Sequence, residues 1–307
     1  MPTRPAAGYT PPMHLVVNPA AAGGRLGKEW PQLQEKLRTL GLDCPISITR
    51  APGHATELAA EAVARGADVV VAVGGDGTIC EVIQGLHNAR GGTLGILPLG
   101  TGNDAARTLA LPLDLEQATR VLLSGGRRRV DLMKAGDKVV FNAIGIGLLG
   151  AINIRSTSIK WVRGIGAYLV AAVANLFAYR GPTVRLNVDG NESVSTMLIL
   201  AIHNGPTTGG GFRLTPGAIP DDGLLDACLV EDIRILGRFP RLVAALQGTL
   251  GTKSGSHPFR FRRMELGTDV ALPAHLDGNP VYIEPPGMVF EVLPSALSVA
   301  SPPPTGS

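Results

Sequence analysis

Short apolar runs alternate with segments of helical spacing over the first 130 residues. The apolar runs predict buried strands at residues 14–18, 46–49, 68–73 and 93–97. Helical spacing is found at residues 28–40, 56–65, 79–86 and 115–124, and a short helix is predicted to end at Leu109. Thr56 is the expected N-cap of the second helix, and Gly41 and Gly66 are expected to end the first two. Alternating strands and helices predict a largely parallel sheet with right-handed crossovers.

The pattern changes near residue 135, where strands and turns follow one another closely. Strands are predicted at residues 138–142, 184–188, 195–203, 224–230, 259–266 and 288–293. Alternation along the fifth of these places Arg260 and Arg262 on one strand face. This half reads as an antiparallel β-sandwich, with one apolar helix at 164–179 that either packs in the core or lines an apolar pocket.

A glycine turn, Gly74-Gly75-Asp76-Gly77-Thr78, joins the third strand to the helix that follows it. Glycines lack the Cβ atoms that keep a ligand away, so backbone N–H groups can converge on an anion at the positive end of the helix. A carboxylate beside bound phosphate must hold Mg²⁺, accept a proton or bond a sugar. Asp76 therefore points to nucleotide chemistry, and a tight turn with a solvated aspartate is the alternative.

Two other glycine-rich stretches are weaker signals. Residues 22–29 resemble a P-loop, but Ala22 replaces the first glycine and Glu29 stands where Ser or Thr would bind metal. Residues 100–105 match GxGxxA, yet they follow the fourth strand and no acidic residue follows at the expected distance. Ligands of parallel sheets bind beyond the strand C-termini, so the loops carrying Asn18, Asp76 and Thr101 are expected to meet.

Composition narrows the function further. The 307 residues are enough for two domains, and 45% hydrophobic with 4% aromatic residues implies an aliphatic core. A net charge of +3 does not suit a dedicated nucleic-acid binder. The three cysteines have no spacing typical of disulfides or zinc, which favours a reducing cytoplasm.

The chain carries no strong membrane signal. Residues 1–12 have no apolar core typical of a signal peptide, and the apolar stretch at 165–179 falls short of the roughly 20 residues that span a bilayer. We therefore expect a soluble protein that can still work at a membrane surface.

Several motifs in order resemble the diacylglycerol kinase catalytic-domain family, which includes soluble bacterial lipid kinases and the sphingosine and ceramide kinases. The matching residues are Asn18-Pro19, Thr49 with 53–55, 74–78 with Glu81, 97–104, Phe141-Asn142, 209–212, 214–216, 221–226 and Asp277-Gly278. The resemblance covers most of the chain.

This resemblance implies a domain organisation. A flexible N-terminus (1–12) would precede an α/β nucleotide-binding domain (13–134) of the phosphofructokinase and NAD-kinase kind. A β-sandwich lipid-binding domain (135–288) would follow, with a final strand near 289–299 returning to the first domain and a tail at 302–307.

The resemblance also implies ATP and Mg²⁺ as cofactors and a lipid alcohol, most simply diacylglycerol, as substrate. The protein would be cytoplasmic and bind membranes peripherally and transiently. The residues expected around the nucleotide are Asn18, Pro19, Thr49, Gly74, Gly75, Asp76, Gly77, Thr78, Glu81, Gly100, Thr101, Asn103 and Asp104.

Phosphoryl transfer to a hydroxyl needs a carboxylate to accept the proton. Asp76 is the first candidate for metal or base duty, and Asp277 is the candidate from the second domain. The family usually has Asp-Gly-Glu here, whereas this chain has Asp277-Gly278-Asn279. An amide is no base at neutral pH, so Asp277 either takes over that duty or is a simple turn residue.

A structural Mg²⁺ site is implied at Asp222, with the backbone carbonyls of Ile219 and Leu224, although a hairpin turn explains this stretch equally well. His203 reads as a local histidine rather than a catalyst. An NAD-kinase-like enzyme and a catalytically silent nucleotide- or lipid-binding regulator are the alternative functions, the second because of Asn279. The sequence does not identify the lipid or the oligomeric state.

Overall fold

The computed structural model describes residues 12–158, 178–209 and 211–303, so residues 164–177 of the predicted apolar helix lie outside the described residues. Contacts divide the chain into two compact units. The first unit comprises Met1–Val130 with Ser295–Ser307, and the second comprises Asp131–Pro294.

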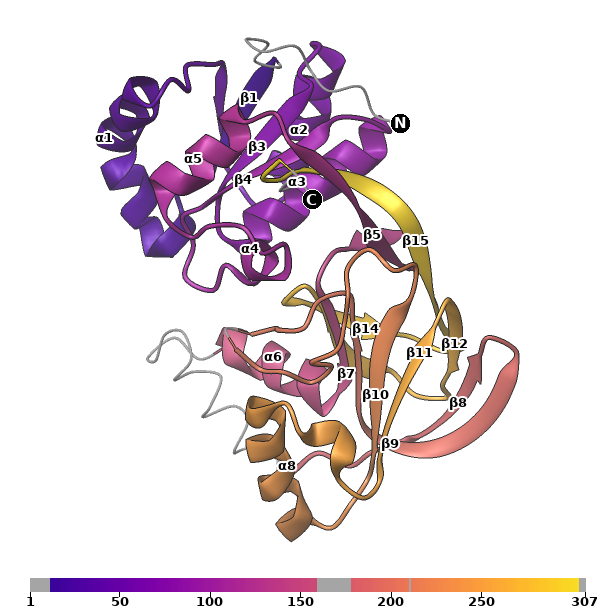
Figure 1. The fold of residues 1–307 in the computed structure, drawn as a ribbon. Helices are drawn as coiled ribbons and strands as arrows, with labels where there is room; N and C mark the ends of the chain where they lie inside the picture. Colours follow the sequence, from indigo (N-terminus) through magenta and orange to yellow (C-terminus); the bar gives the residue numbers. More distant parts are fainter. Residues whose placement is uncertain (1–11, 159–177, 210, 304–307) are drawn as a thin grey trace. The chain divides into compact units, whose positions relative to one another are not determined.

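The first unit is a parallel sheet with helices on both faces (Figure 1). Its strands are β1 (Met13–Val17), β2 (Ile46–Ile48), β3 (Val69–Gly74) and β4 (Thr93–Pro98). Its helices are η1 (Ala21–Gly24), α1 (Arg25–Thr39), α2 (His54–Ala64), α3 (Asp76–Ala89), α4 (Asp104–Thr108) and α5 (Leu115–Leu123). The strand order is β4-β3-β1-β2, and the end of β15 (Gly287–Ala300) adds to β4 in parallel at Ser298 and Val299. The predicted α/β fold with a parallel sheet is confirmed.

The continuous apolar runs of β1, β3 and β4 are buried at every position and supply both faces of this sheet. Leu15, Val71 and neighbouring residues pack with Trp30 of α1 and Leu122 of α5 in one core cluster. The helices α2 and α3 lie on the other face and pack closely on each other (Figure 1). A Cβ on Gly85 would lie 2.4 Å from the Thr56 carbonyl oxygen, so the close approach of the two helices requires glycine there.

The predicted cap of α2 is wrong. The helix begins at His54, with Gly53 as its N-cap at φ 87°, and Thr56 lies within the first turn. The Thr56 hydroxyl instead donates to the Glu81 carbonyl oxygen at 3.0 Å. The Thr56 hydroxyl, which the local pattern predicted to cap α2, is therefore hydrogen-bonded to a carbonyl of α3 instead.

The second unit is an antiparallel β-sandwich, as predicted. Its strands are β5 (Arg127–Ala135), which continues from the first unit, β6 (Lys138–Val140), β7 (Ala143–Gly147), β8 (Thr183–Val188), β9 (Asn191–His203), β10 (Leu225–Glu231), β11 (Ser256–Phe261), β12 (Arg263–Gly267), β13 (Leu272–Leu276), β14 (Asn279–Ile283) and most of β15. Its helices are α6 (Leu148–Ser158), α8 (Ile235–Gln247) and η2 (Leu250–Thr252).

The long strand β9 belongs to both sheets of the sandwich. One sheet has the order β11-β10-β9-β7-β13-β14, and the other continues from β9 through β8 and β12 to β15. Leu186, Ile202, Phe261 and Phe290 belong to the core that the sheets share. A second cluster includes Ile152 of α6 and the buried face of α8, so these helices cover the outer face of the first sheet.

The strand predicted at 259–266 is two strands, and the prediction that Arg260 and Arg262 share one strand face is wrong. β11 ends at Phe261 and pairs with β10, whereas β12 begins at Arg263 and pairs with β8 and β15. The Asp189 carboxylate accepts the backbone N–H groups of Arg262 and Arg263 at 2.8 to 3.2 Å and holds the chain at this break.

Among the residues that the structure describes, no helix combines the length and the apolar character needed to cross a bilayer.

Candidate nucleotide-binding site

A pocket of about 390 Å³ opens within the first unit where the loops after β1, β2, β3 and β4 converge. Nine of the predicted nucleotide-binding residues line it: Asn18, Pro19, Thr49, Gly75, Gly77, Thr78, Glu81, Gly100 and Thr101. The other four, Gly74, Asp76, Asn103 and Asp104, do not line it and lie in the same loops or the helix starts beside them. The sheet topology brings these loops together, because parallel strands end at one edge.

Asn18 links the loop after β1 to α3. Its side-chain amide donates to the Thr78 hydroxyl at 2.9 Å, and its Oδ1 accepts the Ala20 N–H at 3.0 Å. A Cβ on Gly74 would lie 2.6 Å from the Thr78 hydroxyl oxygen, so glycine is needed for this packing. Asn18 and Thr78 therefore fix one wall of the pocket.

Two glycines from different loops lie back to back at the base of the pocket. A Cβ on Gly100 would lie 2.3 Å from the Cα of Gly75, and one on Gly75 would lie 3.2 Å from the Cα of Gly100. A Cβ on Gly77 would meet nothing within 4 Å, so this position faces open space. The first pair lets two backbones approach each other, and the third glycine leaves room for a ligand.

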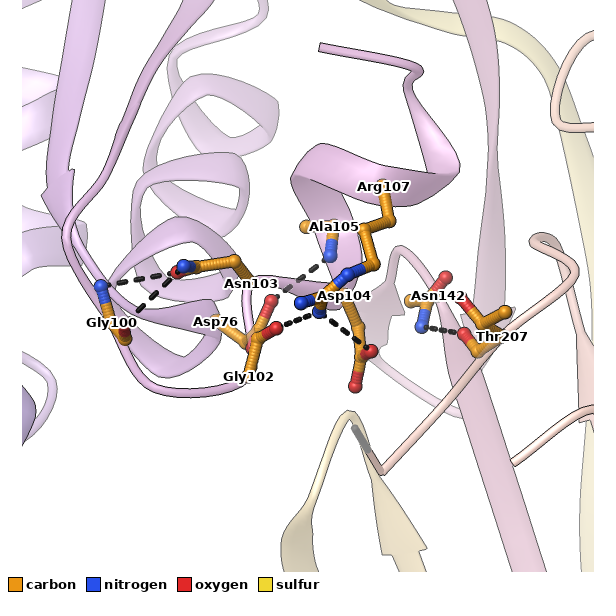
Figure 2. A network of polar contacts seen from close by, with 9 residues as sticks. All are labelled: Asp76, Gly100, Gly102, Asn103, Asp104, Ala105, Arg107, Asn142 and Thr207. Atoms are coloured by element: carbon orange, nitrogen blue, oxygen red, sulfur yellow. Dashed lines mark hydrogen bonds and ion pairs between the residues drawn. The ribbon is translucent and has the colours of Figure 1, made fainter. Parts of the chain in front are cut away.

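Asp76 is the first residue of α3, and its carboxylate reaches the start of α4 (Figure 2). Its Oδ1 accepts the Ala105 N–H at 2.9 Å. Asn103 adopts a left-handed conformation, which asparagine tolerates, and its Oδ1 accepts the Gly100 N–H at 3.1 Å. These bonds tie the β4 loop to the glycine turn after β3.

Asp104, only 8% exposed, brings a second carboxylate to this loop. Its Oδ1 lies 3.6 Å from Nη1 of Arg107, and that guanidinium also donates to the Gly102 carbonyl (Figure 2). A Cβ on Gly102 would lie 2.8 Å from Asp76 Oδ2 and 3.8 Å from Asp104 Oδ2. Asp76 and Asp104 therefore point to the same small volume.

Glu81 lines the pocket, but its carboxylate is hydrogen-bonded to backbone N–H groups of the protein. Its two oxygens accept the N–H groups of Gly53 and Ala55 at 2.8 and 3.1 Å, at the start of α2. The bonds hold residues 50–52, which form another wall of the pocket. Sequence motifs did not single out Arg50, Ala51 or Pro52, because their role comes only from this tertiary contact.

The residues of the first unit fit a nucleotide with magnesium. The pocket has glycine at the positions where a Cβ would collide or fill the space, and α3 begins at its rim. Among the described residues, no cluster of three His, Cys, Asp or Glu side chains exists to cage a metal. Mg²⁺ commonly takes one or two carboxylates together with substrate phosphates, which Asp76 and Asp104 can supply.

In the second unit, Asp277 holds the loop that precedes β7. Its carboxylate accepts the N–H groups of Phe141, Asn142 and Ala143 at 2.7 to 2.9 Å. Asn142 in turn donates to the Thr207 carbonyl oxygen at 2.9 Å (Figure 2). The geometry gives Asp277 an anchoring role, and its role as proton acceptor stays a prediction.

Asn279 opens strand β14 two residues later and is exposed. His203 is 1% exposed, and its Nδ1 lies 2.8 Å from the Thr215 hydroxyl. Burial, together with nearby His275, lowers the pKa of His203 to about 3. A neutral, enclosed imidazole bonded to a neighbouring threonine agrees with the interpretation of His203 as a local histidine.

The turn proposed for a structural metal contains an ion pair in this structure. Asp222 Oδ1 accepts the Leu224 N–H at 3.1 Å, and its Oδ2 accepts from the Arg260 guanidinium. Nε of Arg260 also lies 3.4 Å from Asp226 Oδ2. A cation held by Asp222, Ile219 and Leu224 would take the place of this guanidinium, so the metal site remains a prediction.

Comparison with known proteins covers both units. Residues 12–135 match the family described as "Diacylglycerol kinase catalytic domain", and residues 142–301 match "YegS C-terminal NAD kinase beta sandwich-like domain". A "Probable lipid kinase YegS-like" from Chromohalobacter salexigens is 33% identical over 280 residues, covering 89% of each chain. One from Pseudomonas aeruginosa is 34% identical over 272 residues, covering 86% of this chain and 87% of the relative.

A solved structure agrees with these matches. The crystal structure of a "putative diacylglycerol kinase" from Bacillus anthracis is 25% identical and covers 95% of this chain and 97% of its own, with a TM-score of 0.77. The chain therefore belongs to the family of YegS-like lipid kinases, in which a diacylglycerol kinase catalytic domain precedes a YegS-type C-terminal domain.

Proposed function

We propose that the protein is an ATP-dependent kinase that phosphorylates the free hydroxyl of diacylglycerol to give phosphatidic acid. The observation that carries the nucleotide half of this proposal is the glycine-lined pocket at the start of α3. The lipid half rests on the family, whose relatives are named for lipid kinase activity.

The chain's own residues position the nucleotide. Backbone N–H groups of the glycine turn bind phosphate oxygens, while Asn18 and Thr78 keep the loop after β1 against α3. Bound Mg²⁺ supplies charge neutralisation on the phosphates. The γ-phosphorus bonds to the lipid hydroxyl oxygen as its bond to the β,γ-bridging oxygen breaks, and the hydroxyl proton passes to a carboxylate.

Asp76 is the carboxylate that we propose for this proton or for the metal. Its Oδ1 accepts the Ala105 N–H, and its Oδ2 lies toward Gly102, where the Asp104 carboxylate also points. Asp277 is less suited, because three backbone N–H groups already use its carboxylate. Asn279 has no basic site at neutral pH.

NAD is a second acceptor that the experiment must include. The description of the second unit as NAD kinase beta sandwich-like is the observation that favours it. The alternative of a silent binding protein follows from Asn279, and it predicts ATP binding without phosphoryl transfer.

The test incubates the full chain with Mg²⁺ and ATP labelled at the γ-phosphate, together with diacylglycerol, other lipid alcohols or NAD. We expect label in phosphatidic acid. Label in NAD alone would replace the proposal with the NAD-kinase reading. ATP binding with no transfer to any acceptor, and transfer gained in Asn279→Glu, would support the silent regulator.

Asp76→Asn separates charge from hydrogen bonding at the site. The amide oxygen can still accept the Ala105 N–H, so the fold should persist while the negative charge is lost. We expect transfer to fall by at least about a hundredfold, the scale of a lost acid–base group. Asp43→Asn, whose side chain is 71% exposed in the same unit, is the matched control.

A further inference from the structure

Helix α8 carries a stripe of partly exposed apolar side chains. Ile235, Phe239, Val243 and Leu246 are 37%, 40%, 52% and 49% exposed. Their spacing of four, four and three residues places them on one side of the helix. Four of the ten exposed large apolar side chains of the described residues thus lie on this helix, so they form a patch rather than scattered single residues.

The opposite side of α8 holds the helix on the sandwich. Ala244 and Ala245 are buried, and Ala245 belongs to the cluster that includes α6 and β10. Arg238 is 4% exposed and pairs with Asp232 at 2.7 Å while donating to the Tyr179 carbonyl. The helix is therefore held on the sandwich by this face, and the partly exposed stripe lies on the other side of the helix.

Basic residues outnumber acidic ones along α8 and the segment that follows it in the sequence. Residues 233–264 contain seven arginines and lysines and no acidic residue. Arg234 is exposed at the N-cap, and exposed Lys253 follows in the loop after η2. Exposed Arg213 lies at the other end, where its backbone N–H donates to the Ala245 carbonyl at 2.9 Å. An apolar stripe with cations at both helix ends is typical of helices that lie in the membrane interface.

We propose that α8 docks the second unit on a membrane leaflet containing anionic lipid, with its apolar stripe inserted among the acyl chains. This proposal rests on the proposed lipid substrate, which resides in such a leaflet. The basic side chains near the helix ends meet the phosphate headgroups, and their long stems let the charges remain at the interface. The patch is a binding surface that the motifs quoted from the sequence do not include.

Sedimentation with vesicles tests the docking without ATP. The full chain is mixed with vesicles of phosphatidylcholine and phosphatidylglycerol in equal parts, or of phosphatidylcholine alone. We expect binding to the anionic vesicles and much weaker binding to the neutral ones. No binding to the anionic vesicles would overturn the proposal, and equal binding to both would overturn its claim that anionic lipid is recognised.

A matched pair of valines locates the surface. Val243 is 52% exposed on α8, and Val270 is 51% exposed in the loop after β12. We expect Val243→Gln to lower the vesicle partition coefficient several-fold and Phe239→Gln with Leu246→Gln to lower it at least about tenfold, the scale of losing buried apolar side chains. Val270→Gln should bind as the wild type does. Unfolding midpoints confirm that each variant is folded. If the α8 variants bind vesicles as strongly as the wild type does, α8 is not the membrane-binding surface.

Two further measurements distinguish membrane docking from dimer formation through α8 and from a failure of the proposed kinase activity. Light scattering reports whether the wild type is a dimer that the α8 variants dissociate, and such a result would assign the stripe to a second copy and overturn the membrane proposal. Phosphorylation of a short-chain, water-dispersed diacylglycerol should be unchanged in the α8 variants. If the wild type does not phosphorylate this diacylglycerol, the result counts against the proposed kinase function. The vesicle-binding result is independent of that outcome and tests the docking proposal alone.

Discussion

Replacing Gly100 by alanine tests the packing of the two glycine loops directly. The new Cβ would lie 2.3 Å from the Cα of Gly75 and 3.1 Å from its nitrogen. Carbon atoms in contact need about 3.5 to 4.0 Å, so the two loops must separate by more than about 1 Å. We expect a loss of about 1 to 3 kcal/mol in the free energy of unfolding, the usual cost of overpacking.

Two neighbouring glycines supply the comparison. A Cβ on Gly75 would lie 3.2 Å from the Cα of Gly100, which a shift of a few tenths of an ångström relieves. A Cβ on Gly77 would meet nothing, and alanine there gains about 0.5 to 1 kcal/mol from helix propensity. The expected order of stability is therefore Gly77→Ala above Gly75→Ala above Gly100→Ala.

Urea unfolding with fluorescence of Trp30 measures this order. Trp30 is 9% exposed in the core of the first unit, and a Trp161→Phe background leaves it as the single tryptophan. ATP binding is measured in parallel, and we expect Gly100→Ala to lose at least about tenfold in affinity, since a shift of about 1.4 kcal/mol suffices. Equal unfolding midpoints and equal ATP affinity for Gly100→Ala and the wild type would refute the back-to-back packing.

Three further predictions concern the second unit. Burial lowers the pKa of His203 to about 3 and that of His275 to about 4. As the pH falls, the unfolded chain therefore binds protons on these histidines before the folded chain does. The free energy of unfolding should be at its full value above pH 6.5 and fall by roughly 1 kcal/mol per pH unit for each histidine down to about pH 4. Urea titrations across pH check this, and a His203→Gln variant with the same pH slope as exposed His87→Gln would contradict it. Asp277→Asn weakens the bonds to three backbone N–H groups and should cost about 3 kcal/mol in thermal or urea unfolding, whereas full stability with lost activity would instead indicate a purely catalytic carboxylate. Arg260→Gln leaves Asp222 and Asp226 without their cation, so Mg²⁺ should raise the melting temperature of this variant more than that of the wild type; equal shifts would show that the guanidinium does not occupy a cation position.

Local patterns account for the parts of the fold that the sequence predicted well. The buried valine run of β3 and the glycines that follow it are adjacent in the chain, so their strand, turn and helix can be read from spacing alone. The alternation of such units then implied a parallel sheet, whose loops meet at one edge.

Errors appeared where a distant residue decides the local conformation. The break between β11 and β12 depends on Asp189, more than 70 residues away, and the predicted cap Thr56 bonds to α3 instead. Helix α8 was not predicted, because Gly237 and Pro240 within it are poor helix residues and packing on the sandwich outweighs that preference.

The sequence by itself determined that a glycine turn begins a helix at the edge of a parallel sheet, because glycine's freedom and hydrophobic periodicity act over a few neighbouring residues. Only the tertiary structure decided that Gly100 meets Gly75, that Asp277 anchors the Phe141–Ala143 loop and that α8 exposes an apolar stripe. Each of these features joins or exposes residues according to how distant segments pack, and no local pattern contains that information.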